Sequence, residues 1–175
     1  MKHFLIVVDM QKDFVDGSLG TPEAVKIVPQ AAARIRAFDG EIFATLDTHQ
    51  ADYLDTAEGR KLPVVHCVCG TEGWRLNAEV EKALAERGYT AVEKPTFGSM
   101  ILPKLIKDRA DGEAFSMEVL GLCTDICVVS NALLLKAAFP EAPISVPAGC
   151  CAGVTPEKHE AALAVMESCQ IDVLR

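Results

Sequence analysis

Short apolar runs alternate along the chain with longer segments in which apolar residues recur at every third or fourth position. A continuous apolar run is typical of a strand buried on both faces of a parallel sheet, and the periodic segments are typical of helices that cover such a sheet. The predicted strands are 3–9, 41–47, 89–94, 116–123, 143–149 and 171–174, with a short extended piece at 64–68.

Two of the predicted helices begin with the same three residues, Thr-Pro-Glu, at Thr21 and Thr155. Threonine is a favourable N-cap, and proline suits the first helical position. The predicted helices are 21–38, 74–88, 99–109 (a broken one), 124–139 and 155–169. This alternation favours an α/β fold with three layers, α/β/α, around a mostly parallel central sheet. No repeat, linker or low-complexity tract divides the chain, so we expect a single domain over 1–175.

Four polar or reactive residues fall at the carboxyl ends of predicted strands: Asp9, Asp47, Lys94 and Cys123. In open α/β sheets the ligand binds at this edge. Four such residues at one edge are more than packing requires, so the sequence predicts a functional site there.

Acidic residues outnumber basic ones, 25 to 17, which gives a net charge of −8. Such a chain is poorly suited to phosphate backbones, so nucleic acid is not an expected partner. No stretch approaches the roughly 20 apolar residues of a membrane span, and the apolar run before Asp9 is too short for a signal-peptide core. We therefore expect no membrane partner and a cytoplasmic location.

Of the seven cysteines, Cys127 in "GLCTDICVV" has the most reactive context. With Thr124 as the cap, Cys127 falls in the first helical turn, where backbone amides and the helix dipole favour a thiolate. We expect Cys127 to have a lower pKa than Cys123, which is placed to contribute its backbone amide. The alternative is that Cys127 is a buried packing residue.

A nucleophilic thiol needs a base and often a neighbouring cation. Asp9 is the first polar residue after a buried strand and could take the thiol proton and return it to a leaving amine. Lys94 ends its own strand, where its charge could pair with Asp9 and lower the pKa of the thiol. A helix cap or surface acid for Asp9, and a solvated lysine for Lys94, are the alternatives.

These stretches together resemble the isochorismatase-like cysteine hydrolases, and within them the nicotinamidase branch. "DMQKDF" at 9–14 matches the family's opening acid-x-Gln-x-Asp-Phe signature, and "GLCTDICV" matches its nucleophile motif. The resemblance implies an isochorismatase-like, Rossmann-like fold and a catalytic triad of Asp9, Lys94 and Cys127. It also implies a cis peptide between Leu122 and Cys123, with the amides of Cys123 and Cys127 forming the oxyanion hole.

A second group of residues has the composition of a metal site. Asp47 and His49 are two apart at a strand end, and His66 follows later in the chain. Two imidazoles and a carboxylate suit zinc, iron or manganese, although two unrelated histidines would explain the sequence equally well. The resemblance favours the metal, because nicotinamidases carry an Asp-x-His pair and a later His, a pattern that "HCVCGTEG" at 66–73 fits. The loop between lacks the further histidine of many nicotinamidases, so Glu58 is the candidate fourth ligand, ahead of Asp52 and Asp55.

Phe14 and Phe97 are candidates to line a pocket for a flat ring, although either could be a core residue. A second departure from the resemblance is Pro63, which stands three residues before His66 where an aromatic residue is frequent. These departures bear on the substrate more than on the reaction.

The function implied is hydrolysis of a small amide, with nicotinamide the first expected substrate and NAD salvage the expected context. A zinc ion is the expected cofactor. The alternatives are a family reaction on a carbamoyl or ureido compound, hydrolysis of isochorismate, or a non-catalytic metal- or redox-sensing protein. The resemblance also implies a homo-oligomer, either a dimer or a tetramer.

Overall fold

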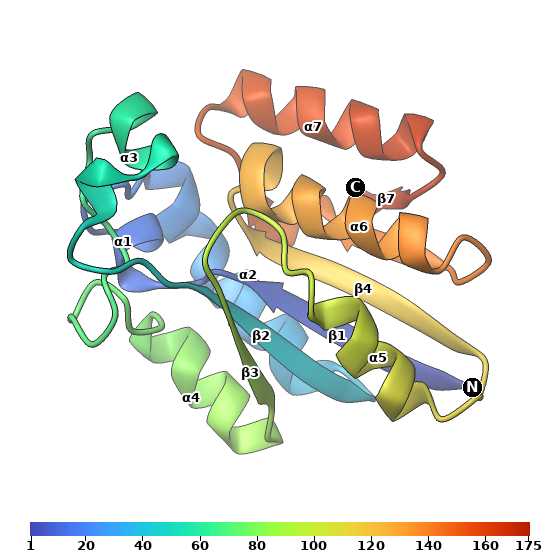
Figure 1. Cartoon of the computed structure of the whole chain (residues 1–175). Helices are drawn as coiled ribbons and strands as arrows, with labels where there is room; N and C mark the ends of the chain where they lie inside the picture. Colours follow the sequence, from blue (N-terminus) through green and yellow to red (C-terminus); the bar gives the residue numbers. More distant parts are fainter.

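One seven-stranded parallel sheet forms the centre of the protein in the computed structural model, which describes residues 1–175 (Figure 1). Six strands follow the order β3-β2-β1-β4-β5-β7, and β6 pairs with the end of β4. Their bounds are β1 Lys2–Val8, β2 Glu41–Asp47, β3 Thr90–Lys94, β4 Phe115–Leu122, β5 Ile144–Pro147, β6 Cys151–Ala152 and β7 Asp172–Leu174. The predicted α/β class is confirmed.

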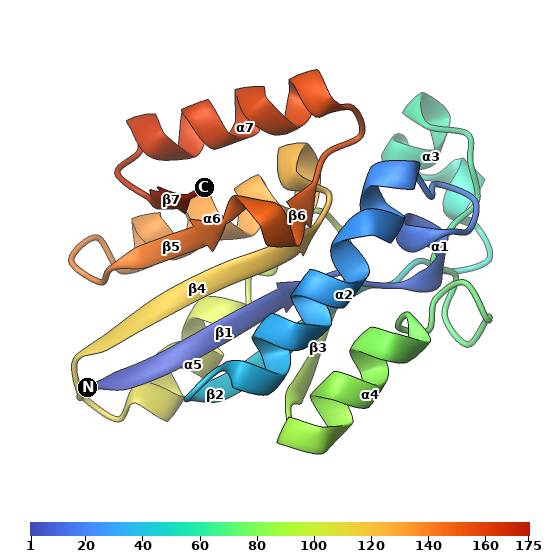
Figure 2. The same cartoon turned by 180° about the vertical axis from the view of Figure 1, so that it is seen from behind.

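Helices cover both faces of this sheet. Helices α5 (Leu102–Ala110), α6 (Val129–Ala138) and α7 (Pro156–Ser168) lie on the face seen in Figure 1. Helices α2 (Pro22–Ala37) and α4 (Ala78–Arg87) lie on the opposite face (Figure 2). The predicted three layers are therefore present. None of the helices combines the length and the apolar character that a membrane span requires.

Five short helices were not predicted as separate elements. They are α1 (Lys12–Val15), α3 (Ala57–Lys61), the 3₁₀ helices η1 (Tyr53–Asp55) and η3 (Ala148–Cys150), and the π-helix η2 (Thr124–Val128). Each is too short for a periodic apolar pattern to develop in the sequence. The small strand β6 was missed for the same reason.

Two predicted segments differ from the structure. The piece at 64–68 is not a strand, since it makes only an isolated bridge between His49 and Val68. The helix predicted from residue 74 begins at Ala78, because the side chain of Asn77 accepts hydrogen bonds from the amides of the first turn. The other predicted strands and helices are present with boundaries shifted by a few residues.

Gly121 lies close to the backbone of the neighbouring strand β1. It pairs with Val8, its φ is +123°, and a Cβ at this position would lie 2.2 Å from the Val8 carbonyl oxygen. A residue other than glycine rarely adopts this φ, and its Cβ would also overlap the backbone of β1. The glycine that opens "GLCTDICV" is therefore required by packing next to the turn that carries Cys127.

We expect Gly121→Ala to lower the free energy of unfolding by about 3 kcal/mol, from backbone strain and steric overlap together. The matched control is Gly112→Ala, since Gly112 also has a positive φ but has no atom within 4 Å of an added Cβ. The control should lose only about 1 kcal/mol. Urea denaturation of both variants measures the difference, and equal losses would contradict the role of close approach.

Candidate active site

The strand order brings four of the predicted site residues to one edge. Strands β3, β2, β1 and β4 are consecutive neighbours and all parallel, so their carboxyl ends lie side by side. Asp47 and Lys94 are direct partners in the sheet register. Asp9 and Cys123 are the residues that follow β1 and β4. The four residues therefore lie at one edge of the sheet.

The ammonium group of Lys94 lies between the candidate nucleophile and the candidate base. Its Nζ is 2.6 Å from Asp9 Oδ2 and 3.5 Å from Cys127 Sγ. It also donates to the Thr96 carbonyl oxygen, at 3.0 Å, and lies 3.4 Å from Asp47 Oδ1. Lys94 is 1% exposed and Asp9 is completely buried, so these charges contact one another rather than water.

Burial shifts the pKa values of Lys94 and Asp9. Desolvation would lower the pKa of Lys94, but Asp9 and the other anionic groups around it raise that pKa and keep the amine protonated. Desolvation raises the pKa of Asp9, against the opposing charge of Lys94. The arrangement is a carboxyl and an ammonium group in direct contact, both withdrawn from solvent.

The expectation that the environment of Cys127 favours a thiolate is wrong. Burial raises its pKa well above the ordinary value and the Asp9 carboxylate raises it further, although Lys94 acts in the opposite direction. Burial likewise raises the pKa of Cys123 to about 12. The surroundings of Cys127 therefore favour the neutral thiol.

Asp9 is held in an unusual conformation by β2. Its φ is +47°, a region that residues other than glycine rarely occupy. The Asp9 amide donates to the Thr45 carbonyl oxygen, at 3.2 Å, and the Thr45 hydroxyl donates to Asp9 Oδ1, at 2.7 Å. One carboxylate oxygen is thus held by Thr45 and the other contacts Lys94, which fixes the orientation of the carboxyl group.

The turn after β4 differs in detail from the predicted one. The residue that precedes the helix is Cys123 rather than Thr124, and Cys127 lies in the π-helix η2 that leads into α6. Thr124 does not cap the helix, because its hydroxyl is hydrogen-bonded to His159 Nδ1, at 2.8 Å. The predicted cis peptide between Leu122 and Cys123 is present.

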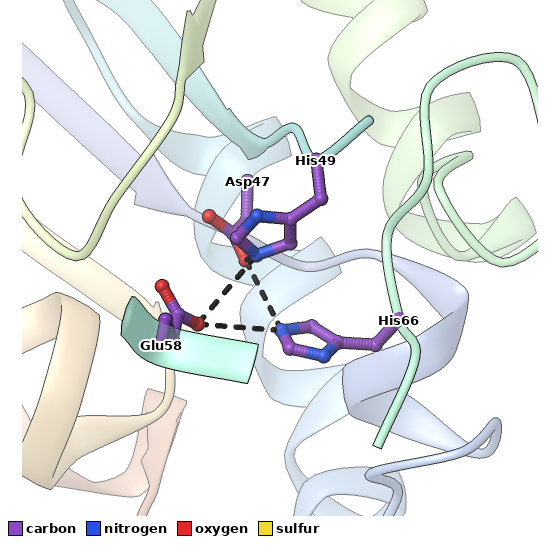
Figure 3. Close-up of side chains that lie close together, drawn as sticks. All are labelled: Asp47, His49, Glu58 and His66. Carbon is purple, nitrogen blue, oxygen red and sulfur yellow. Dashed lines mark ion pairs between the residues drawn. The ribbon is translucent and has the colours of Figure 1, made fainter. Parts of the chain in front are cut away.

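The second predicted cluster also assembles. Asp47, His49, Glu58 and His66 direct four ligand atoms toward one point, all within 4.8 Å of one another (Figure 3). Asp47 Oδ2 is 3.0 Å from His49 Nε2 and 3.5 Å from His66 Nε2. Glu58 reaches the same point from the short helix α3. Asp52 and Asp55, the weaker candidates, are exposed and lie outside the cluster.

The ring nitrogens fit a divalent metal. His66 Nδ1 donates to the Val64 carbonyl oxygen, at 2.7 Å, which leaves Nε2 as the lone-pair nitrogen that faces the cluster. His49 Nε2 is buried and makes no hydrogen bond of good geometry, although Asp47 lies beside it. Burial would raise the pKa of Asp47, but the adjacent imidazoles and the charge of Lys94 lower it overall. Two imidazoles and two carboxylates form a suitable donor set for zinc.

Residues that the sequence did not single out support this cluster. The side chain of the fully buried Gln11 accepts from the Asp47 amide, at 2.8 Å, and donates to the Asp47 carbonyl oxygen, at 2.9 Å. Tyr53 packs against both imidazoles, with ring centroids 4.6 Å from His49 and 4.9 Å from His66. Asp13 Oδ2 accepts from the amide that follows His66, at 2.8 Å. Gln11 and Asp13 both belong to "DMQKDF", so this motif supports the cluster as well as containing Asp9.

A cavity of about 250 Å³ connects the two clusters. Cys123 and Cys127 line one part of it, and Asp47, Glu58 and His66 line another. Most of the remaining wall is apolar, and a single cation, Lys158, lies on it. The other lining residues are Phe14, Leu19, Thr21, Leu62, Phe97, Ile126 and Val154. The predicted pocket residues Phe14 and Phe97 thus both border the cavity.

The model of the isochorismatase domain matches residues 3–175. The chain belongs to the isochorismatase family. The match covers nearly the whole sequence, so this isochorismatase-family chain is a hydrolase with the fold described above. A search of the curated proteins gave no significant match.

Among solved structures, the chain is similar to nicotinamidase/pyrazinamidase PncA from Bacillus subtilis, with 26% identity, full coverage of both chains and a TM-score of 0.85. It is similar to pyrazinamidase of Pyrococcus horikoshii, solved in complex with zinc, with 26% identity, coverage of 100% and 99%, and a TM-score of 0.81. It is also similar to N-carbamoylsarcosine amidase from Thermoplasma acidophilum, with 26% identity, coverage of 100% and 96%, and a TM-score of 0.79.

We expect Gln11→Glu to weaken zinc binding by about 10- to 100-fold, the usual effect of removing a group that orients a ligand. The variant loses the donor to the Asp47 carbonyl oxygen and places a second anion beside that backbone. Competition with a chromophoric chelator measures the affinity. Gln30→Glu, the same change at an exposed position of α2, is the control. Unchanged zinc affinity in a folded Gln11→Glu protein would contradict the orienting role.

Proposed function

We propose that the chain is a metal-assisted nicotinamidase that converts nicotinamide and water into nicotinate and ammonia, a step of NAD salvage. The observation that carries the proposal is the shared cavity, in which Cys127 and the metal-ligand cluster face the same small space. At about 250 Å³ this cavity is smaller than the roughly 300–1,000 Å³ typical of sites for drug-sized ligands. Its aromatic and aliphatic wall suits one flat ring.

The proposed reaction begins at Cys127. Asp9 accepts the thiol proton as the sulfur attacks the carboxamide carbon, and the carbonyl oxygen becomes an oxyanion. The backbone amides of Cys123 and Cys127 are the proposed donors to this oxyanion. Lys94 remains protonated and stabilises the ionised form of Asp9 and the developing thiolate, which its Nζ contacts at 2.6 and 3.5 Å.

Ammonia then leaves. Asp9 returns the proton to the leaving nitrogen as the C–N bond breaks, which gives a thioester between the acyl group and Cys127. A water molecule attacks the thioester while Asp9 accepts its proton, the C–S bond breaks, and the thiol is restored as the carboxylic acid departs. Asp9 thus moves one proton in each half of the reaction.

The proposed ligands of the metal are Asp47, His49, His66 and Glu58, and zinc is the proposed ion. When bound, it would supply a Lewis-acid anchor, directly or through its waters, for the ring nitrogen of the substrate. The donor set and the zinc complex of the pyrazinamidase from Pyrococcus horikoshii support this choice. Phe14, whose ring centroid is 5.5 Å from that of His66, would pack on the same substrate ring.

Ammonia release from nicotinamide and pyrazinamide tests the proposal. In zinc-loaded protein we expect Cys127→Ala to reduce kcat at least about 10³-fold, because the attacking atom is removed. We expect His49→Ala to reduce kcat/KM about 10- to 100-fold through loss of the metal. Cys169→Ala, which changes an exposed thiol at the end of α7, serves as the control and should retain full activity. Ammonia release that persists in Cys127→Ala would overturn the mechanism.

A carbamoyl or ureido compound is the second candidate substrate, favoured by one observation. Lys158 is the one cation on the cavity wall apart from the triad, and nicotinamide carries no charge for it to contact. An N-carbamoyl amino acid would present a carboxylate to this ammonium group. The similarity to N-carbamoylsarcosine amidase is consistent with such a substrate.

Lys158→Met separates the two candidates. If the substrate is nicotinamide, we expect KM to change less than about twofold, because an exposed charge contributes little to binding a neutral ring. If the substrate is an N-carbamoyl amino acid, we expect KM to rise about tenfold through loss of a charge-assisted contact. Steady-state kinetics of the wild type and the variant with both compounds decide between them.

A further inference from the structure

Residues 95–101 connect β3 to α5 (Figure 1). This segment forms part of the cavity wall through Phe97. It contains no helix or strand, and no backbone amide from 96 to 101 donates to a backbone carbonyl oxygen. Its apolar side chains do not anchor it either, since Phe97, Met100 and Ile101 are all exposed. Ser99 Oγ accepts from the Leu102 amide, at 3.3 Å. The other side-chain hydrogen bonds to the wall segment, as we call residues 95–101, come from other elements.

One buried amide supplies most of these bonds. Asn131, on α6, is 1% exposed, and its Nδ2 donates to the Phe97 carbonyl oxygen, at 3.1 Å. Its Oδ1 accepts from the Ser99 amide, at 2.9 Å. Lys94 adds the bond from Nζ to the Thr96 carbonyl oxygen. Close packing completes the attachment, since a Cβ on Gly98 would lie 2.5 Å from Leu134 Cδ1 of α6.

The same amide group also holds the nucleophile. Asn131 Nδ2 donates to the carbonyl oxygen of Cys127, at 2.8 Å, in addition to that of Phe97. Both hydrogens of the amide nitrogen are therefore engaged, and the amide oxygen accepts one bond. No other side chain bonds to both the wall segment and the backbone of Cys127.

We propose that Asn131 is a positioning residue that fixes the distance between the substrate-binding wall at Phe97 and the attacking sulfur of Cys127. The inference rests on the proposed amide hydrolysis, but it holds for either candidate substrate, because both must lie between Phe97 and Cys127. A flat substrate is held at attack distance only if the wall and the nucleophile keep their separation. One asparagine that bonds to both provides that constraint.

Two substitutions remove some or all of the hydrogen bonds that the Asn131 side chain makes. Asn131→Asp keeps the size and an oxygen for the Ser99 amide, but it cannot donate to the two carbonyl oxygens and places a negative charge against them. Asn131→Leu removes all three bonds at similar volume. We expect each to raise KM about tenfold and to lower kcat about tenfold, because both binding of the ring and alignment of the sulfur are impaired.

Loss of stability alone must be distinguished from loss of positioning. Leu135→Ala, one turn further along α6, truncates a fully buried side chain and leaves every bond of Asn131 in place. It should lower the melting temperature at least as much as the Asn131 variants do while KM stays within about twofold of the wild type. An equal rise of KM in Leu135→Ala would show that Asn131 acts only through stability and would overturn the proposal.

Hydrogen exchange gives a measurement that does not depend on the substrate. In Asn131→Leu we expect the amide of Ser99 to exchange at least about tenfold faster, because its only acceptor is removed, with no such change in Leu135→Ala. The kinetic comparison uses whichever compound the wild type hydrolyses. If the wild type does not hydrolyse nicotinamide, the proposed substrate is wrong, but the role of Asn131 can still be tested. Unchanged exchange at Ser99 together with unchanged KM in a folded Asn131 variant would refute the inference.

Discussion

The buried ammonium group of Lys94 is the interaction on which the candidate active site depends. Two carboxylates, Asp9 and Asp47, lie at neighbouring strand ends, away from water, and each would be costly to ionise there without a nearby positive charge. Lys94 contacts both. It therefore allows a candidate base and a candidate metal ligand to exist as anions in one small apolar region.

The parallel sheet explains how a few residues, far apart in sequence, form the candidate active site. Each of the strands β1, β2 and β3 contributes one charged group at its carboxyl end, and β4 leads directly into the turn with Cys127. Neighbouring parallel strands end at nearly the same level, so residues far apart in sequence meet without any long connecting structure. The backbone of β2 also holds Asp9 in its positive-φ conformation, through Thr45.

Much of this arrangement could be predicted from the sequence, because buried parallel strands produce continuous apolar runs and a polar residue at their end is easily recognised. Asp9, Asp47 and Lys94 were found in this way. The supporting residues could not be found, since Gln11 and Asn131 act through backbone groups whose positions no local pattern reveals. The error about the pKa of Cys127 has a similar origin. A helix start favours a thiolate, but the degree of burial, which decides the sign here, is a property of the folded chain.

Glu58 lies in the connection between β2 and β3, away from the other ligand residues in sequence. Asp47 and His49 stand at the end of β2, whereas Glu58 lies on a five-residue helix in a long connection that returns to His66. An ion bound by all four side chains would act as a cross-link that closes two loops of this connection at a single point, as a disulfide does. Such closure reduces the conformational entropy of the unfolded chain and couples folding of the region to metal supply. Metal availability would then govern not only catalysis but also how long this part of the protein survives a protease.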